Sequence, residues 1–372
     1  MMQMEMGGSE RLVHNLLLKL DRNIFNPSLA WFFGDRLLKE FKDLDIPLYR
    51  VPKEKRIDFS AMRKFGAIIK NNNIHVVNAH HFMSMVYAYY GSKIENRTKL
   101  VYTEHSEWEI EQISWKWNII GSYLLSHTDA AVGVTAAVTK QIQNRFNADA
   151  SKTITIPNGV DLKALSRNGS INDLREQLGL ASDEKVIAIT ANLKKIKNHI
   201  FLLTAFKELL KSYNNIKLLL IGQGFVNDAE NTEQELRDYV NEKEITNKVL
   251  FLGYRSDISQ LLNITDIFCL TSLKEGLPIS LIEAMAVGLP VVGTNVEGIR
   301  DVIIHNQNGS LVNIGDVESL KNALLILLKN ESMRRKYGEK SRSLAKETYS
   351  LDHCVKKYQD LYVSMMGDRL SV

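Results

Sequence analysis

Two glutamates flank the start of a predicted helix in the second half of the chain. Glu275 follows an apolar, strand-like run, and Glu283 lies eight positions later, one or two turns into the helical segment 280–286. The unpaired amides at a helix start carry about +0.5 of a charge and bind a diphosphate without a metal. The two carboxylates could accept hydrogen bonds from a sugar and from a ribose diol, each worth about 1.5–3 kcal/mol. The alternative is a surface acid and a helix-face acid with no role.

The residues around these acids resemble glycosyltransferase family 4, a group of retaining enzymes with the GT-B fold. The resemblance runs through Glu275-Gly276-Leu277-Pro278 and through the segment 283–292, and it extends over the second half of the chain and more loosely over the first. It implies that Glu275 contacts the donor sugar and Glu283 the nucleotide ribose. It also implies that the backbone between them contacts sugar and phosphate, at Gly276, Leu277, Pro278, Ile279 and Ser280.

A basic loop follows the first predicted strand of the second half. The leaving diphosphate gains negative charge in the reaction, and a fixed cation lowers that barrier. The family supplies an arginine and a lysine here; Lys197 matches the lysine, whereas Asn192 stands at the arginine position. Lys194 or Lys195 is a candidate replacement for the missing charge. A solvated loop without function is the alternative.

Two further loops of the second half match family segments beside the nucleotide. Gly222 and Gly224 follow one predicted strand, and Arg255 follows the next. Paired glycines after a strand are weak evidence by themselves, because most such turns only reverse the chain.

In the first half, His105 ends a predicted strand where the family places a histidine that faces the reaction centre. The resemblance implies that it contacts a sugar hydroxyl or stabilises the developing oxocarbenium ion. A hydrogen-bonded loop histidine is the alternative. His80 and His81 end the preceding predicted strand, but no third ligand at a suitable spacing predicts a zinc site.

Gly7 and Gly8 resemble the first glycine turn of the acceptor domain, a loop for the acceptor or a phosphate, and Ser9 is a candidate helix cap. In a doubly wound domain an apolar strand leads into this turn. The few residues before Gly7 are mostly methionine, so that first strand is expected to be missing.

Strand-like and helix-like segments alternate along the whole chain. Continuous apolar strands are expected in the second half at 185–190, 216–221, 249–252, 267–270 and 290–292, and helices at 199–211, 231–243, 280–286 and 299–304. The first half repeats this alternation less clearly. Such strands predict parallel sheets covered on both faces. The fold class expected is α/β, and the resemblance specifies GT-B, two facing Rossmann-like domains with a cleft between them.

A turn at Pro157-Asn158-Gly159 marks the expected domain boundary. The predicted domains are an N-terminal acceptor-side domain over 1–158, a C-terminal nucleotide-sugar-binding domain over 159–348, and a closing helix over 349–372 that returns to the first domain.

Composition limits the classes of function. The 372 residues are 45% hydrophobic and carry a net charge of +4, from 47 basic and 43 acidic side chains. This excess is too small to predict nucleic-acid binding. Two cysteines give no disulfide framework and favour a reducing compartment. No apolar run approaches the roughly 20 residues of a membrane span, and no signal peptide is recognisable. These features predict a cytoplasmic protein. The basic run 50–56, with Arg63 and Lys64, leaves open a peripheral contact with the inner face of the cell membrane.

The sequence therefore predicts a glycosyltransferase. By resemblance it is a retaining hexosyltransferase that uses a nucleotide-diphosphate sugar, a saccharide or lipid-linked acceptor, no cofactor and no metal, in cell-surface polysaccharide synthesis. Two alternatives stay open: a catalytically impaired or truncated nucleotide-sugar-binding protein, and a GT-B-fold epimerase. The sugar, the base, the acceptor and the linkage are not predicted.

Overall fold

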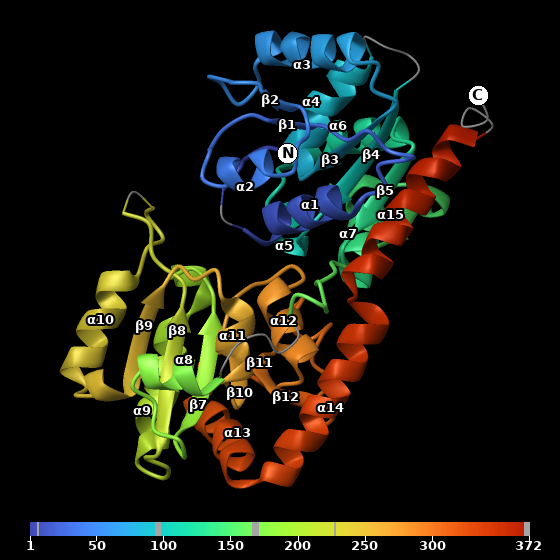
Figure 1. The fold of residues 1–372 in the computed structure, drawn as a ribbon. Coiled ribbons are helices and arrows are strands. Elements are labelled where there is room, and N and C mark those ends of the chain that lie inside the picture. The colour runs from blue at the N-terminus through green and yellow to red at the C-terminus, as the bar shows by residue number, and fades with distance from the viewer. Residues whose placement is uncertain (6, 94–97, 166–170, 227, 368–372) are drawn as a thin grey trace. The chain divides into compact units, whose positions relative to one another are not determined.

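The structure is a computed structural model that describes residues 1–5, 7–93, 98–165, 171–226 and 228–367. The chain forms two compact units (Figure 1). Unit 1 contains Met1–Gly159 and Leu351–Val372, and unit 2 contains Val160–Ser350. Both consist of parallel strands with helices on their faces.

Unit 1 has a two-stranded sheet, β1-β2, and a four-stranded sheet, β3-β4-β5-β6. The strands are β1 (Leu29–Trp31), β2 (Leu48–Arg50), β3 (Val76–His80), β4 (Lys99–Glu104), β5 (Ala130–Gly133) and β6 (Thr153–Thr155). The helices are α1 (Gly8–Lys19), α2 (Leu38–Lys42), α3 (Phe59–Asn71), α4 (Phe82–Ser92), α5 (Glu107–Glu111), α6 (Trp115–Ser126), α7 (Ala136–Phe146) and α15 (Leu351–Met366).

Helices α1 and α15 pack together in unit 1. Their buried side chains, among them Leu16 and Tyr358, share one core with Val101 of β4 and Val132 of β5. The last helix of the chain therefore belongs to the same core as the first. Residues 368–372, at the end of the predicted closing segment 349–372, lie outside the described ones.

Residues 1–4 lie beside β1. Gln3 forms a single parallel bridge with Phe33, and the buried Met4 joins the core. β1 and β3 belong to two separate sheets of unit 1.

Unit 2 has one six-stranded parallel sheet in the order β12-β11-β10-β7-β8-β9. The strands are β7 (Lys185–Thr190), β8 (Ile216–Ile221), β9 (Val249–Gly253), β10 (Ile267–Leu270), β11 (Val291–Thr294) and β12 (Gly309–Val312). The helices are α8 (Ile171–Gln177), α9 (His199–Leu210), α10 (Glu233–Glu242), α11 (Ile258–Asn263), α12 (Ile279–Val287), α13 (Val317–Lys329) and α14 (Glu331–Thr348).

Apolar packing covers both faces of this sheet. Alternate residues of β7, Val186 and Ala188, meet Leu261 of α11 and Leu174 of α8 in one cluster. Ile187, which points to the other face, is also fully buried. Burial of both faces explains why the strands of unit 2 are continuous apolar runs.

The helix expected at 299–304 does not form. The segment makes single turns, with Val302 and Ile303 both donating to the carbonyl of Ile299 and the side chain of Asn308 accepting from Ile304. The Ile304 amide bonds to the Asn308 side chain rather than to a carbonyl of the segment, and such side-chain hydrogen bonds compete with a helical ladder.

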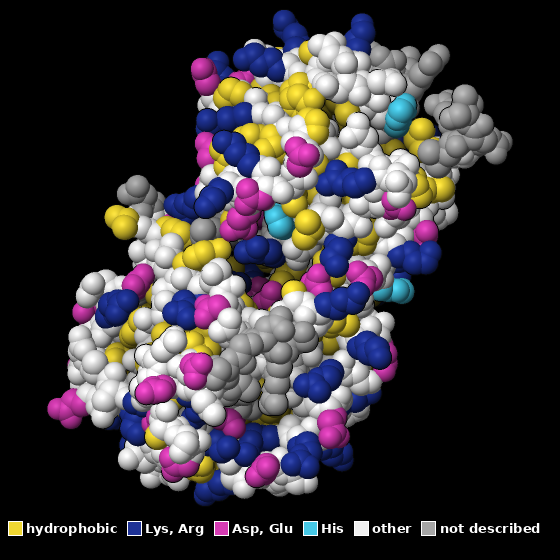
Figure 2. All heavy atoms as spheres, in the orientation of Figure 1, with side chains coloured by type: hydrophobic (Ala, Val, Ile, Leu, Met, Phe, Trp, Pro, Cys, Tyr) yellow, Lys and Arg dark blue, Asp and Glu magenta, His cyan; other side chains and the backbone are white. Residues whose placement is uncertain are grey.

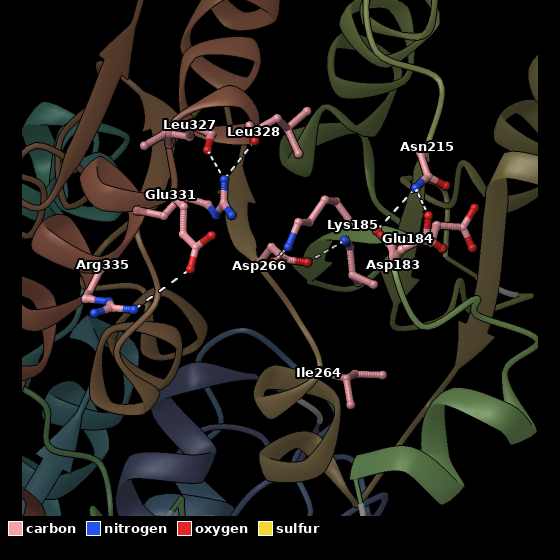
Figure 3. A network of polar contacts seen from close by, with 12 residues as sticks. Asp183, Glu184, Lys185, Asn215, Ile264, Asp266, Leu327, Leu328, Glu331 and Arg335 are labelled. Carbon is pink, nitrogen blue, oxygen red and sulfur yellow. Dashed lines mark hydrogen bonds and ion pairs between the residues drawn. The ribbon is translucent and has the colours of Figure 1, made fainter.

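Polar contacts fix the amino ends of the strands in unit 2 (Figure 3). Asp266, just before β10, accepts from the Lys185 ammonium at 3.1 Å and from the Val186 amide at 2.9 Å, which ties β10 to β7. Asn215 donates to Asp183 at 2.9 Å across the start of β8. This network holds the strands at their amino ends. Ligands of open α/β sheets bind at the other edge, outside the carboxyl ends of the strands.

Candidate active site

Unit 2 has a topological switch point between β7 and β10. From β7 the chain runs outward to β8 and β9, and then returns to β10 on the other side. The loops that leave the carboxyl ends of β7 and β10 therefore lie at the switch point, where open α/β sheets usually bind ligands. Lys197 lies in the first of these loops and Glu275 in the second.

Lys197 and Glu275 meet directly. The Lys197 ammonium lies 2.6 Å from Glu275 Oε1, and the Ser272 hydroxyl donates to the same oxygen at 2.5 Å. The two charged side chains are 24% and 10% exposed. The backbones also join, since the Leu273 amide donates to the Ile196 carbonyl at 2.8 Å. The switch point thus presents one fixed cation and one fixed carboxylate side by side.

Helix α12 begins just after this pair. Its N-cap is Pro278, and no side chain caps it, so the amides at its start are available to an anion. Leu277, Pro278 and Ile279 are buried, whereas Gly276 and Ser280 are half-buried. Glu283 lies on the second turn and is half-buried too. The predicted diphosphate segment is therefore a helix start, as the sequence indicated.

Sequence reasoning missed Gly298, which packs against the backbone of Glu275 and Gly276. Gly298 has a φ of +75°, and a Cβ there would lie 1.6 Å from the carbonyl oxygen of Gly276. Only glycine allows the loop after β11 to press against the backbone beside Glu275. The sequence signal was the glycine four residues after a strand, in Val296-Glu297-Gly298.

The loops after β7 and β8 are joined through their backbones. Gly222, with a φ of +141°, leaves no room for a Cβ, which would lie 2.0 Å from the Ala191 oxygen. Asn192 is half-buried in the β7 loop. The Lys194 ammonium pairs with Asp228 at 2.6 Å, so its charge is already balanced. This pairing argues against Lys194 as the replacement for the family arginine.

Gly224 and Arg255 have partners within unit 2. The Gly224 amide donates to Glu233 at 2.9 Å. The Arg255 guanidinium holds Asp257 through two bonds, of 2.7 and 2.5 Å. The bidentate pair raises the pKa of Arg255 and lowers that of Asp257. Arg255 is therefore a rigid element of the loop after β9.

In unit 1, His105 lies at the carboxyl end of β4 among other histidines. Its Nε2 is 2.9 Å from His80 Nδ1, and its ring centroid lies 4.7 Å from that of the His81 ring, which is tilted against it. Burial, followed by the nearby His81 and His80, lowers the pKa of His105 well below its usual value. His105 Nδ1 is buried and has no hydrogen-bond partner among the described residues. That nitrogen is the atom that a ligand could engage.

His81 is held as a cation. Its Nδ1 lies 2.8 Å from Glu109 and 3.6 Å from Glu104. Burial alone would lower its pKa, but the bonds to Glu104 and Glu109 outweigh that effect and raise the pKa to about 10. Glu104 is fully buried and also accepts from the Tyr102 hydroxyl at 2.5 Å.

Two potential metal ligands lie beside His81 that sequence spacing did not indicate. Atoms of His81, Glu104 and Glu109 capable of binding a metal lie within 4.8 Å of one another. Sequence spacing could not show this, because α5 brings Glu109 to His81 through the fold. The three side chains already satisfy one another as a cation between two carboxylates.

Gly7 is the N-cap of α1, in an extended conformation with a φ of −142°. The expected cap by Ser9 does not form, since its hydroxyl donates to Glu10 at 2.8 Å. Gly8 is the first residue of the helix. Both glycines lie where residues 1–5 lead into α1.

Parallel sheets with a switch point and an uncapped helix start are features of α/β proteins that bind nucleotides and other phosphates. Comparison with known proteins identifies the family. The model "Glycosyltransferase Family 4" matches residues 6–164, and "Glycosyl transferases group 1" matches residues 170–344. The chain belongs to this glycosyltransferase family and is an enzyme of the GT-B fold.

Two curated relatives and one solved structure are similar to this chain. It is 25% identical over 335 residues to N-acetyl-alpha-D-glucosaminyl L-malate synthase of Bacillus anthracis. The matched region covers 88% of this chain and 84% of the relative. It is 28% identical over 227 residues to an Escherichia coli UDP-Gal:alpha-D-GlcNAc-diphosphoundecaprenol alpha-1,3-galactosyltransferase, covering 59% of this chain and 56% of that one. The crystal structure of Anabaena Alr3699/HepE with UDP and glucose superposes with a TM-score of 0.86, at 20% identity and 98% coverage of both chains.

Proposed function

We propose that this glycosyltransferase moves a hexose-type sugar from a nucleotide-diphosphate donor to a saccharide or lipid-linked acceptor, with retention of anomeric configuration. The observation that carries the proposal is the Lys197–Glu275 pair at the switch point, beside the uncapped start of α12. A cation, a row of amides and a carboxylate are what a diphosphate joined to a sugar requires.

In this proposal the diphosphate binds the amides at the start of α12 and the Lys197 ammonium. Lysine has three N–H donors, so Lys197 can keep its bond to Glu275 and also donate to a phosphate oxygen. As the glycosidic bond breaks, negative charge grows on the diphosphate, and these donors stabilise it without moving. Glu275 accepts hydroxyl groups of the sugar, Glu283 accepts the ribose diol, and Gly222, Gly224 and Arg255 line the nucleotide.

His105 has a separate role in unit 1. The sugar becomes cationic in the transition state, and an imidazolium at this position would repel it. Burial keeps His105 neutral, since its pKa lies well below the usual value. The Nδ1 atom of a neutral ring can then serve a hydroxyl or the developing oxocarbenium ion. The leaving phosphate is proposed to accept the proton of the acceptor, so that no protein base is required.

The printed names of one relative and one group of solved complexes support a UDP-sugar as donor, and the name of that relative supports a lipid-linked acceptor. UDP occurs in the names of the Escherichia coli relative and of the Anabaena complexes, and the former acts on a diphosphoundecaprenol-linked sugar. UDP-glucose, UDP-galactose and UDP-N-acetylglucosamine are therefore the first donors to test, with GDP- and ADP-sugars as comparisons.

Hydrolysis of the donor in the absence of acceptor provides the test. We expect slow release of UDP from one of these donors, loss of that release in Glu275→Ala, and an α-anomeric sugar as the first product by proton NMR. Binding without turnover would favour an impaired nucleotide-sugar-binding protein. Inversion at C1, or interconversion of the donor sugar, would exclude the proposed reaction.

We also propose that no metal is required, because Lys197 and the helix amides supply the positive charge. Transfer should then be unchanged after treatment with EDTA. A loss of activity that Mg²⁺ or Mn²⁺ restores would contradict this part of the proposal.

Peripheral membrane contact, proposed for a lipid-linked acceptor, is best supported by α6. Trp115, Ile119 and Tyr123 are spaced by four residues along one face of this helix, and they are 68%, 63% and 55% exposed. Arg56, from the basic run 50–56, lies 5.2 Å from the ring of the adjacent Trp117. Exposed aromatic and aliphatic side chains beside basic ones are typical of a surface that lies in an anionic lipid interface. None of the described helices is long and apolar enough to cross a membrane.

Vesicle sedimentation tests this contact. The chain should bind vesicles that contain phosphatidylglycerol, and the triple variant Trp115→Ser, Ile119→Ser, Tyr123→Ser should bind at least tenfold more weakly. Ile326→Ser, an equally exposed apolar residue on α13 of unit 2, is the matched control. Equal binding by the two variants, or a change in self-association alone, would reject the membrane contact.

A further inference from the structure

Three hydroxyl side chains are buried at the carboxyl ends of β10 and β11. Thr271 and Ser272 directly follow β10, Thr294 is the last residue of β11, and none of the three is exposed to solvent. A buried hydroxyl is costly unless it forms a hydrogen bond. All three donate one, and every acceptor lies in one of the two loops that carry Lys197 and Glu275. These hydroxyls have no part in the reaction proposed above.

The Thr271 hydroxyl holds the backbone that carries Lys197. It lies 3.3 Å from the carbonyl oxygen of Lys197 and 3.2 Å from that of Asn198. A hydroxyl has one proton to donate, so the two carbonyl groups share one three-centre hydrogen bond. Asn198 has a left-handed backbone, with a φ of +50°, where the turn that contains Lys197 ends. Thr271 therefore fixes this turn to the end of β10.

The Ser272 hydroxyl holds the Glu275 side chain itself. It donates at 2.5 Å to Oε1, the same oxygen that lies 2.6 Å from the Lys197 ammonium. The Ser272 backbone is fixed in turn, because its carbonyl oxygen accepts from the Thr294 hydroxyl at 2.5 Å. The other carboxylate oxygen, Oε2, forms no hydrogen bond with the part of the chain that the structure describes. Two donors on Oε1 thus leave Oε2 to a ligand.

The two donors to Oε1 respond differently to a bound diphosphate. The Lys197 ammonium is charged, and phosphate oxygens attract it as strongly as a carboxylate does. An ammonium shared between two anions holds each of them less firmly. The Ser272 hydroxyl is neutral, its only proton is already donated to Glu275, and its side chain is not exposed to solvent. Ser272 is therefore the donor that stays on Glu275 while the diphosphate is bound.

We propose that Ser272 is a positioning residue for the carboxylate that binds the sugar. Its hydroxyl keeps Glu275 in place while Lys197 is shared with the diphosphate, and Thr294 keeps Ser272 in place. This role rests on the proposed function, because it requires that Glu275 accepts hydroxyl groups of the sugar. It predicts that the loss of Ser272 affects the sugar and leaves the nucleotide unaffected.

The test separates binding of the nucleotide from reaction of the sugar. Ser272→Ala should bind UDP within about threefold of the unmodified chain, because Lys197 and the amides of α12 are unchanged. Its kcat for donor hydrolysis should fall by about 10- to 100-fold, through the loss of one hydrogen bond to a charged group. Ser341→Ala is the matched control, since Ser341 is a fully buried serine of unit 2 that donates to the Asn308 carbonyl. Neither quantity should change in it.

Thr294 offers a pair of variants that differ in the hydroxyl alone. Thr294→Val keeps the shape of the side chain and removes the donor to the Ser272 carbonyl, whereas Thr294→Ser keeps the donor. The valine variant should lose kcat by about 3- to 10-fold at unchanged UDP affinity, and the serine variant should keep most of the unmodified kcat. Equal losses in the two variants would mean that packing, and not the hydrogen bond, supports Ser272.

Thermal unfolding measures the contact between Ser272 and Glu275 without any activity. Ser272→Ala should lower the melting temperature of the unmodified chain by at least about 2 °C. It should cost less than about half of that in a Glu275→Ala chain, where the hydroxyl has lost its acceptor. Equal losses in the two chains would show that the two side chains are not coupled, which would overturn the assignment.

Two further results would also overturn the role of Ser272. One is an unchanged kcat in Ser272→Ala, and the other is a parallel fall of kcat and UDP affinity, which would indicate general damage to the site. A failure of the proposed function is distinguishable from both, because it appears as absent donor hydrolysis in the unmodified chain, with the coupling in thermal unfolding still present.

Discussion

Glu275→Gln removes a negative charge from the switch point and leaves the shape of the side chain almost unchanged. In the unsubstituted chain the Glu275 carboxylate lies 2.6 Å from the Lys197 ammonium. The Glu275 side chain is 10% exposed and the Lys197 side chain 24%. A pair this sheltered is worth about 1–2 kcal/mol net, because desolvation offsets most of the attraction. The substitution frees Lys197 by that amount, so UDP should bind roughly 5–30 times more tightly at low salt.

Transfer should respond in the opposite direction. Glutamine accepts sugar hydroxyls without a charge, and two charge-assisted bonds of about 1.5–3 kcal/mol each are weakened. We therefore expect kcat to fall by about 10²- to 10⁴-fold. Calorimetric titration with UDP and a donor-hydrolysis assay measure the two effects on one preparation, and thermal unfolding checks that the variant is folded.

Glu208→Gln is the matched control. Glu208 also pairs with a lysine, Lys211, at 2.7 Å, but both side chains are largely exposed. Neither UDP affinity nor transfer should change in this variant. The reasoning is refuted if Glu275→Gln keeps wild-type transfer, or if its UDP affinity falls together with its activity.

Three other substitutions test separate parts of the account. Gly298→Ala places a Cβ 1.6 Å from the Gly276 carbonyl oxygen at a residue with a positive φ. The variant should have a free energy of unfolding lower by about 2–4 kcal/mol in urea titrations, and it should lose most of its transfer activity. An unchanged urea midpoint would show that the contact is not tight. Asn192→Arg should tighten UDP binding about tenfold, by one charge-assisted bond to the diphosphate, and an unchanged affinity would place residue 192 away from it. His81→Gln should lower the free energy of unfolding by about 1–3 kcal/mol at pH 7. Because the pKa of His81 is raised to about 10 in the folded chain, the stabilisation that His81 provides is complete below pH 6.5 and should vanish as the pH rises through 10. A difference in stability between the variant and the unmodified chain that does not depend on pH would contradict the ion pair.

The sequence predicted much of unit 2, because strands buried on both faces are continuous apolar runs. It did not predict α4, whose buried residues lie on nearly every side. A helix that is apolar all round shows no 3.6-residue periodicity, so the pattern used for the other helices was absent.

The site was predicted only in part for a different reason. Lys197 and Glu275 are 78 positions apart, yet both were named because each lies in a segment that resembles a motif of the family. The contact of Gly298 with Gly276 and the two carboxylates beside His81 join segments that are distant in the sequence, which no local spacing reveals. Their roles follow from three-dimensional packing, which leaves no periodic signal in the sequence.

A crystal structure of the chain with UDP tests the central claim most directly. The account predicts that the diphosphate lies within hydrogen-bonding distance of the amides of Ile279 and Ser280 and of the Lys197 ammonium, with the ribose at Glu283. A diphosphate bound at another edge of the sheet, with Lys197 still closed on Glu275 alone, would contradict it.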